Sequence, residues 1–127
     1  AFKGLRKVID VSSDGPNNAG RPVLLARSDT VSAGVTINGL PLLVPGATVI
    51  DNLDDYYADC VIAGPGAFSL PAHGIADFAQ AIRRKLILEV SGVTPDTPEV
   101  VKAAAPVDCM IGERLRLQYF DRYYPDL

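Results

Sequence analysis

The chain has 127 residues, of which 48% are hydrophobic and 21% charged, and its formal net charge is −3 at pH 7. These values are typical of one globular domain, and the lack of a basic excess argues against nucleic acid as a partner. No apolar run approaches the roughly 18 residues of a membrane-spanning helix, so no transmembrane segment is predicted. The chain begins with Ala1 rather than methionine, so we expect a trimmed precursor that could have carried an export signal.

The first elements alternate between strand and helix. A hydrophobic strand is predicted at residues 5–12, and it leads into the polar turn S-S-D-G at 12–15. A helix is predicted over residues 22–33, where Gly34 is suited to end it in the left-handed conformation. A second strand, rich in β-branched residues, is predicted at residues 35–40. Strand, helix and strand with short connections predict one right-handed parallel crossover.

The middle of the chain continues the alternation. Residues 42–50 read as a small hairpin or an apolar flap, and Asn52 is suited to cap a short helix. A third, short strand is predicted at residues 67–70. Residues 75–90 give the strongest helix prediction, with the cluster Arg83-Arg84-Lys85 on its solvated face. The apolar residues that recur at helical spacing in this segment are Ile75, Phe78, Ala79, Ile82 and Leu86.

Composition changes after Gly92, where T-P-D-T-P reads as a linker. The chain therefore divides into residues 1–92, the α/β part, and residues 93–127, a linker, a short helix near 98–105 and an aromatic tail. We expect that tail to be extended or helical. Its side chains combine large area with hydrogen-bonding groups, a profile typical of protein interfaces. The predicted interface residues are Arg114, Arg116, Tyr119, Phe120, Arg122, Tyr123 and Tyr124, although the tail could equally pack on its own domain.

The chain has two cysteines, Cys60 and Cys109, whose spacing and flanks match no zinc or redox motif. Two interpretations stay open. The residues are either two small buried thiols or a disulfide that ties the tail to the domain. A disulfide would indicate an oxidising compartment.

Four segments carry a resemblance to a known class of domain: residues 2–18, 33–41, 52–68 and 78–90. Their order resembles the second half of a von Willebrand factor A-type domain, and most closely an uncharacterised family of exported bacterial proteins with such a domain. The resemblance implies an α/β fold built as a partial three-layer parallel sheet with helices on both faces, plus a C-terminal tail. It also implies a periplasmic or exported location.

The same resemblance implies a degenerate metal site. In such domains a divalent ion, usually Mg²⁺, lies at the top of the sheet, and Asp14 matches one of its aspartate ligands. Ser12, Ser13 and Asn17 could contribute further oxygens. The D-x-S-x-S loop and the threonine loop of the family precede this segment, so other residues would have to complete the site. The alternative is a tight turn that Asp14 and the serines stabilise through hydrogen bonds to the backbone.

Other ionisable residues favour structural roles. Asp10 alternates with the apolar positions of the first strand, and we expect Arg6 or Lys7 to hold its carboxylate. Asp54, Asp55 and Asp59 fit favourable charges near a helix start. His73 has no nucleophile signature around it.

A partial sheet has a functional consequence. The first strand would expose one edge, and an unpaired apolar edge is a template for association. We therefore predict a fragment of a longer polypeptide or a subunit completed by a partner chain, acting as a non-catalytic protein-binding or assembly module. The alternatives are a structural subunit of a larger, membrane-associated complex and a metal-dependent hydrolase.

Overall fold

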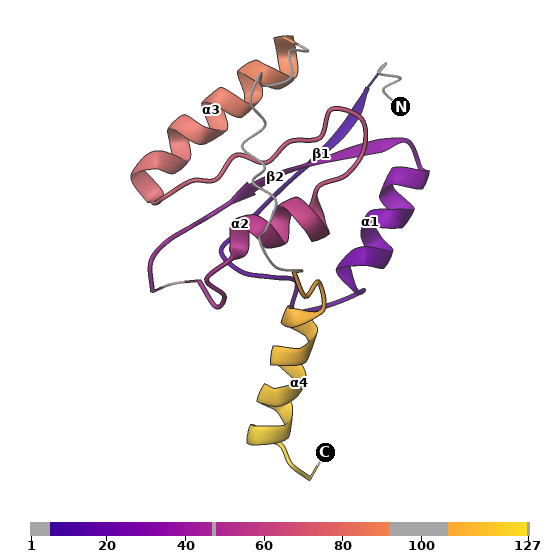
Figure 1. Ribbon diagram of the computed structural model, residues 1–127, viewed down its shortest axis with the longest axis vertical. Coiled ribbons are helices and arrows are strands. Elements are labelled where there is room, and N and C mark those ends of the chain that lie inside the picture. The colour runs from indigo at the N-terminus through magenta and orange to yellow at the C-terminus, as the bar shows by residue number, and fades with distance from the viewer. Residues whose placement is uncertain (1–5, 47, 92–106, 127) are drawn as a thin grey trace.

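The computed structural model describes residues 6–46, 48–91 and 107–126. Within these ranges the chain forms a two-stranded parallel sheet with helices packed around it, which confirms the predicted α/β class (Figure 1). In chain order the elements are β1 (Lys7–Ser13), α1 (Val23–Ser32), β2 (Val35–Pro41), α2 (Leu53–Tyr56), the π-helical turn η1 (Tyr57–Val61), α3 (Ile75–Ser91) and α4 (Ile111–Tyr123).

The first half of the chain folds as the predicted parallel crossover. β1 and β2 pair in parallel, with Ile9 beside Ile37 and Ser13 beside Pro41. α1 connects the two strands and ends just before Gly34, whose φ of +78° is a left-handed conformation that glycine adopts without strain. The prediction for residues 6–41 is therefore confirmed apart from small shifts of the element ends.

The third strand predicted at residues 67–70 does not form as a regular strand. This segment lies along β2 and makes two isolated parallel bridges, from Gly39 to Ser69 and from Leu42 to Ala72. Between the two bridges lies Pro41, which has no backbone N–H to donate across the ladder. The segment therefore follows β2 as an incomplete strand.

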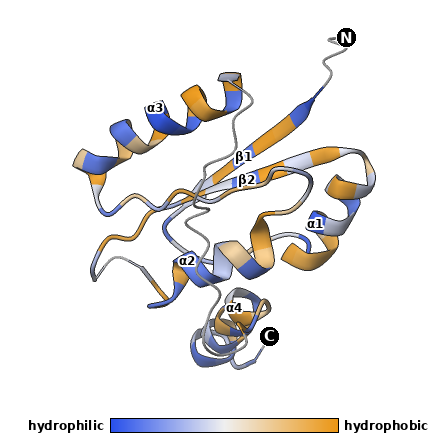
Figure 2. Cartoon of the chain, turned by 45° about the horizontal axis from the view of Figure 1, so that its top comes forward, coloured by the Kyte–Doolittle hydropathy of each residue, from blue (hydrophilic) through white to orange (hydrophobic). Residues whose placement is uncertain are grey.

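Helices cover both faces of this small sheet, as predicted (Figure 2). Ile37 and Leu40 of β2 point to opposite faces because side chains alternate along a strand. On the Ile37 face the buried cluster consists of Ile37, Leu53, Tyr56, Tyr57, Cys60 and Val61. On the opposite face Leu40, Phe68 and Leu70 pack against α3 through Phe78, Ala81, Ile82 and Leu88.

α3 forms where residues 75–90 predicted it, but the face that it buries differs from the prediction. Ile75 is 87% exposed and Leu86 is 49% exposed, so these two residues do not belong to the core. Lys85, predicted to be solvated, is only 3% exposed. The buried face follows Phe78 and Ile82 at helical spacing, and Lys85 is the next residue in that series.

Other local predictions have mixed outcomes. Asn52 immediately precedes α2, but its side chain makes no capping hydrogen bond. Residues 43–46 and 48–50 form an irregular loop and no hairpin among the described residues. The tail adopts the helical alternative as α4. The predicted helix at residues 98–105 and the boundary between residues 92 and 93 lie outside the described residues.

Gly39 lies at the closest approach between β2 and η1. A Cβ atom at this position would lie 2.5 Å from Cδ1 of Tyr57 and 3.0 Å from Cγ2 of Ile62. We expect Gly39→Ala to lower the free energy of unfolding by about 1–3 kcal/mol, the usual cost of overpacking a core. Chemical denaturation measures this change. Gly74→Ala is the control, because an added Cβ meets no atom within 4 Å there, and an equal loss in both variants would contradict the prediction.

Candidate interaction site

The hydroxyl groups of the turn after β1 form hydrogen bonds within the protein. Ser12 Oγ donates to the carbonyl oxygen of Leu40 at 2.8 Å, and Ser13 Oγ donates to that of Gly15 at 2.8 Å. The hydroxyl of Tyr57 lies 2.6 Å from Ser13 Oγ. Either hydroxyl can supply the proton of this contact. The turn is therefore held in place from η1, while the Asp14 side chain is exposed.

Two adjacent tyrosines form hydrogen bonds to this turn and to the loop that follows it. Tyr56 and Tyr57 are each 1% exposed, and the hydroxyl of Tyr56 accepts a hydrogen bond from the backbone N–H of Asn17 at 3.1 Å. Burial raises the pKa of both tyrosines, although their hydrogen bonds to Asn17 and Ser13 act in the opposite direction. Both hydroxyls therefore stay protonated at neutral pH and fix the position of residues 13–17.

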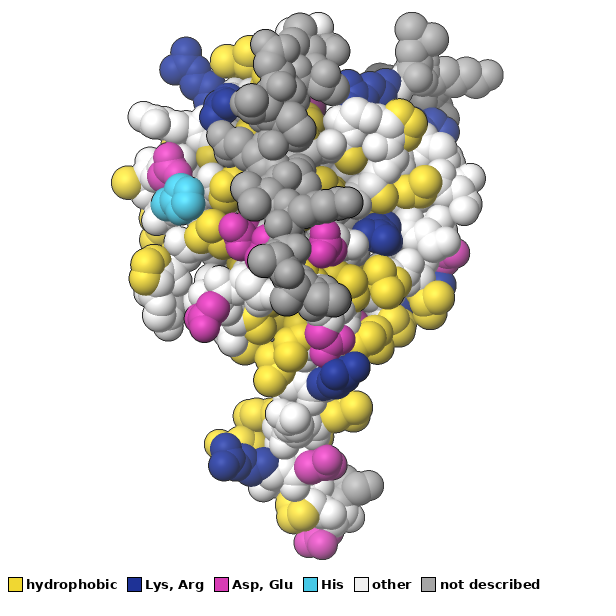
Figure 3. Space-filling view, in the orientation of Figure 1, with side chains coloured by type: hydrophobic (Ala, Val, Ile, Leu, Met, Phe, Trp, Pro, Cys, Tyr) yellow, Lys and Arg dark blue, Asp and Glu magenta, His cyan; other side chains and the backbone are white. Residues whose placement is uncertain are grey.

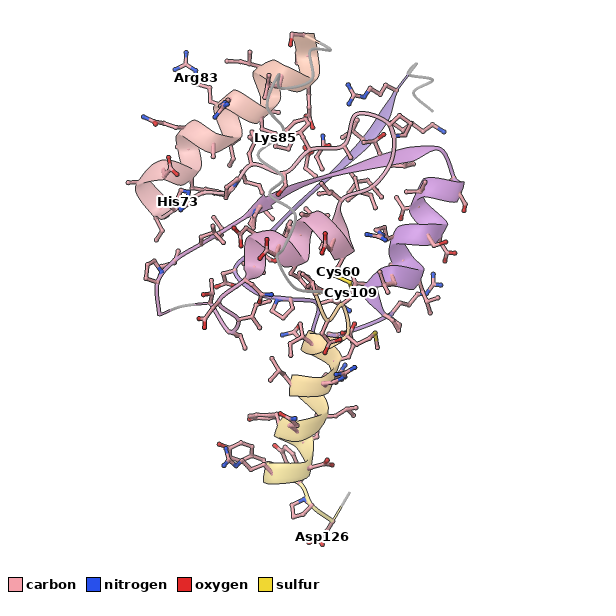
Figure 4. The ribbon with its side chains drawn as sticks, viewed as in Figure 1. Cys60, His73, Arg83, Lys85, Cys109 and Asp126 are labelled. Carbon is pink, nitrogen blue, oxygen red and sulfur yellow. A yellow bond between two sulfur atoms is a disulfide. The ribbon has the colours of Figure 1, made fainter. Side chains whose placement is uncertain are left out.

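A disulfide joins η1 to the start of α4. The sulfur atoms of Cys60 and Cys109 lie 2.03 Å apart, and Cys60 is fully buried (Figure 4). Of the two interpretations of the cysteines, the disulfide is confirmed and the pair of free thiols is wrong. The bond attaches the C-terminal helix to the core cluster on the Ile37 face.

The first turn of α4 also packs directly on the loop after β1. Asn17 Nδ2 donates to Glu113 Oε1 at 2.7 Å. A Cβ atom on Gly112 would lie 1.9 Å from the carbonyl oxygen of Asn17, so only glycine permits this approach of the two backbones. The disulfide and this contact together fix the direction in which α4 leaves the domain.

Beyond its first turn, α4 projects away from the sheet (Figure 1). Its aromatic side chains contact one another along the helix, with ring centroids 4.6 Å apart for Tyr119 and Tyr123 and 6.0 Å apart for Phe120 and Tyr124. The Arg116 guanidinium lies over the Phe120 ring. Hydrophobic, basic and acidic side chains are all visible on the projecting helix (Figure 3). All seven predicted interface residues are on α4 or at its end: Arg114, Arg116, Tyr119, Phe120, Arg122, Tyr123 and Tyr124.

The outer edge of β1 has no strand beside it in the part of the chain that the structure describes. The carbonyl of Ser13 accepts a hydrogen bond from the N–H of Leu42, so Ser13 faces β2. Because hydrogen-bonding direction alternates along a strand, the backbone groups of Val8, Asp10 and Ser12 face away from β2. These residues form the open edge of β1.

An apolar groove lies over β1, next to this open edge. Its volume is about 400 Å³, and its floor includes Ile9 and Val11 while α1 and η1 form its walls. Ile9 is 47% exposed. An aliphatic side chain at the centre of a strand, beside backbone groups that no described residue pairs with, favours association with another chain segment.

An ion pair between the buried Lys85 and the partly exposed Asp10 connects β1 to α3 on the opposite face. Lys85 Nζ contacts Asp10 Oδ2 and lies 3.0 Å from Glu89 Oε1, which also accepts a hydrogen bond from Asn38 Nδ2 at 2.8 Å. The prediction that Arg6 or Lys7 holds the Asp10 carboxylate was therefore wrong. Burial raises the pKa of Asp10. Burial also acts to raise the pKa of Glu89, but hydrogen bonds from Asp10, Lys85 and Asn38 outweigh it and lower that pKa.

The described residues do not assemble a cluster of metal ligands. Across residues 6–46, 48–91 and 107–126, no three histidine, cysteine, aspartate or glutamate side chains come together as a metal ion would require. His73 lies just before α3 (Figure 4), where its backbone N–H donates to Asp77 Oδ2 at 3.0 Å. The metal role of Asp14, Ser12 and Ser13 stays a prediction that depends on ligands from other residues.

A helix that crosses a membrane has to be both long and apolar. Among the residues that the structure describes, no helix combines the length and the apolar character needed to cross a bilayer.

Comparison with known families assigns the chain to a protein family. Residues 1–94 match the family model described as "Protein of unknown function (DUF1194)". The chain therefore belongs to this family, whose members share an uncharacterised domain. No curated protein and no solved structure is significantly similar to the chain.

Some residues of the site were not predicted from the sequence. The supporting roles of Tyr56 and Tyr57 were missed, although two adjacent tyrosines in a short acidic helix are an unusual signal. The contact of Gly112 with Asn17 was also missed. The sequence feature that could have indicated it is a glycine near the start of a helix, close to a cysteine. Lys85 was missed because it belongs to a run of three basic residues that reads as a solvated face.

Proposed function

We propose that this protein is a non-catalytic binding or assembly module that is completed along β1 by an extended segment. The segment belongs either to a partner chain or to another part of the same polypeptide. The observation that carries the proposal is the open edge of β1, where outward backbone groups lie beside the 47%-exposed Ile9 and the apolar groove. Edge strands of this kind bind extended segments by β-strand addition.

The proposal includes a von Willebrand A-like architecture and an exported location. The parallel crossover, the helices on both faces and the polar turn after β1 support the first part. The disulfide between Cys60 and Cys109 supports the second part, because disulfides persist in oxidising compartments such as the periplasm.

A second candidate function is a structural subunit of a larger complex. The observation that favours it is α4, whose aromatic residues Tyr119, Tyr123 and Tyr124 are each more than half exposed. A projecting helix that is fixed at one end and carries exposed aromatic side chains is suited to dock on another subunit.

Amide hydrogen exchange tests the open edge residue by residue. In the isolated chain we expect the amides of Val8, Asp10 and Ser12 to exchange faster than those of Ile9, Val11 and Ser13, because only the second set donates to β2. Assembly should then protect the first set. Equal protection of both sets in an isolated monomer would contradict the proposal, because β1 would already be paired on both sides.

A proline at an outward position gives a matched functional test. Val8→Pro removes a backbone donor that faces away from β2, so it should weaken assembly in light scattering while leaving the β1–β2 pair intact. Val8→Ala is the control, because it shortens the side chain and keeps the donor. Equal assembly by the two variants would argue against strand addition at β1.

A further inference from the structure

We propose that one extended segment binds both the open edge of β1 and the apolar side of α4. The segment belongs to a partner chain. It is a strand parallel to β1, and past its carboxyl end that chain continues across residues 13–18 to α4. This inference rests on the proposed function and specifies the form of the partner.

Two cavities meet at the loop after β1. The first is the groove over β1, and the second, of about 610 Å³, lies between this loop and α4, where Leu115, Tyr119 and Phe120 line it. Four residues line both cavities: Ser13, Gly15, Pro16 and Asn18. The open edge of β1 and the apolar side of α4 therefore belong to one continuous surface, which a single segment can cover.

The fold indicates the direction of that segment. β1 pairs with β2 in parallel, and the bridges from Gly39 to Ser69 and from Leu42 to Ala72 are also parallel, whereas the bridge from Ile37 to Ala63 is antiparallel. α4 lies beyond the carboxyl end of β1 (Figure 1). A strand added in the same direction brings its own carboxyl end to the loop at residues 13–18, because the carboxyl ends of parallel strands meet at one edge of a sheet. The chain that follows it then reaches the second cavity.

Charge and burial along β1 define the chemistry of the segment. Side chains that point toward the groove contact Ile9 and Val11 and should be apolar, while those on the opposite face lie beside the partly exposed Asp10 and should be polar. The amino end of β1 exposes Arg6 and Lys7, and its carboxyl end exposes Asp14. A parallel segment is therefore acidic at its amino end and basic at its carboxyl end, with apolar residues after that.

Synthetic peptides test the inference through fluorescence anisotropy. The core peptide alternates valine and threonine, with glutamates at its amino end and lysines at its carboxyl end. Two longer peptides carry one apolar extension, either after the lysines or before the glutamates. We expect the extension after the lysines to tighten binding about tenfold, and the extension before the glutamates to leave binding unchanged.

Variants of the chain localise the effect. Tyr119→Ala combined with Phe120→Ala should remove the tenfold gain and leave binding of the core peptide unchanged. Leu117→Ala is the matched control, because Leu117 is 63% exposed on the same helix and lines neither cavity. Val8→Pro should abolish binding of all three peptides.

The outcomes separate this inference from the proposed function. A gain from the extension before the glutamates would mean an antiparallel segment and would overturn the inference. If neither extension changes the affinity while Val8→Pro still abolishes binding of the core peptide, the inference of one continuous binding surface is wrong and the proposed function stands. If no peptide binds the folded chain, both fail.

Discussion

Replacing Cys60 and Cys109 with serine is expected to lower the free energy of unfolding by about 4 kcal/mol. The disulfide closes a loop across a sequence separation of 49 residues. In the chain-entropy description, a cross-link over that length removes roughly this amount of conformational freedom from the unfolded chain. Urea denaturation followed by circular dichroism measures the difference. The same variant should also release α4, which would appear as faster amide exchange along that helix.

Reduction of the wild-type protein provides the control for this result. A reductant should lower the stability of the wild type to that of the Cys60→Ser, Cys109→Ser double variant, and it should not affect the variant itself. If the denaturation midpoint of the wild type is the same with and without reductant, the bond does not hold α4 to the domain in solution.

Replacing Lys85 with methionine is expected to lower the free energy of unfolding by about 3 kcal/mol. The Lys85 side chain is 4% exposed, whereas that of Asp10 is 44% exposed and that of Glu89 is 16% exposed. Methionine preserves the apolar stem but leaves two neighbouring carboxylates without their cation. Breaking a buried pair costs about 3–5 kcal/mol, and the partial exposure of Asp10 places this case at the lower end. Thermal and urea denaturation both measure the loss.

The pH dependence of this variant distinguishes charge from packing. In the wild type the pKa of Glu89 is lowered from 4.5, so the stability that its carboxylate contributes to the fold is present above that pH and is lost as the pH falls. The raised pKa of Asp10 changes the stability in the opposite direction. Without Lys85 both carboxyl groups bind protons more readily in the folded state. The cost of Lys85→Met should therefore shrink as the pH falls below about 4. Arg83→Met, on the exposed side of α3 (Figure 4), is the control and should have little effect; a pH-independent cost of Lys85→Met would indicate a packing defect.

The fold of the first half could be predicted because its signals are local. The β-branched run in β2, the proline before α1 and the glycine after it each act within a few residues, and together they specify a parallel crossover. The prediction of a regular third strand was wrong for a reason that involves two segments. The prolines at positions 41 and 71 are each compatible with an edge strand, but the missing donor of Pro41 matters only once β2 has its neighbour.

The site was harder to predict because it depends on contacts between distant residues. The aromatic content of α4 was visible in the sequence, and so were the two cysteines, but their pairing was not. The buried role of Lys85 depends on Asp10, which lies on another element. Helical periodicity alone places Lys85 on the buried face, and the expectation that a basic run is solvated outweighed that signal. Tertiary pairing of charges is the information that a single sequence does not display.

The contact between Gly112 and Asn17 has a mechanical consequence. A helix of 13 residues is about 20 Å long, so a tilt of about 10° at its first turn moves its far end by roughly 3 Å. The glycine keeps the two backbones so close that a shift of the loop after β1 is passed directly to the helix. Because residues 15–18 also line the groove, a displacement of this loop would be expected to tilt α4 and to move the tyrosines at its far end.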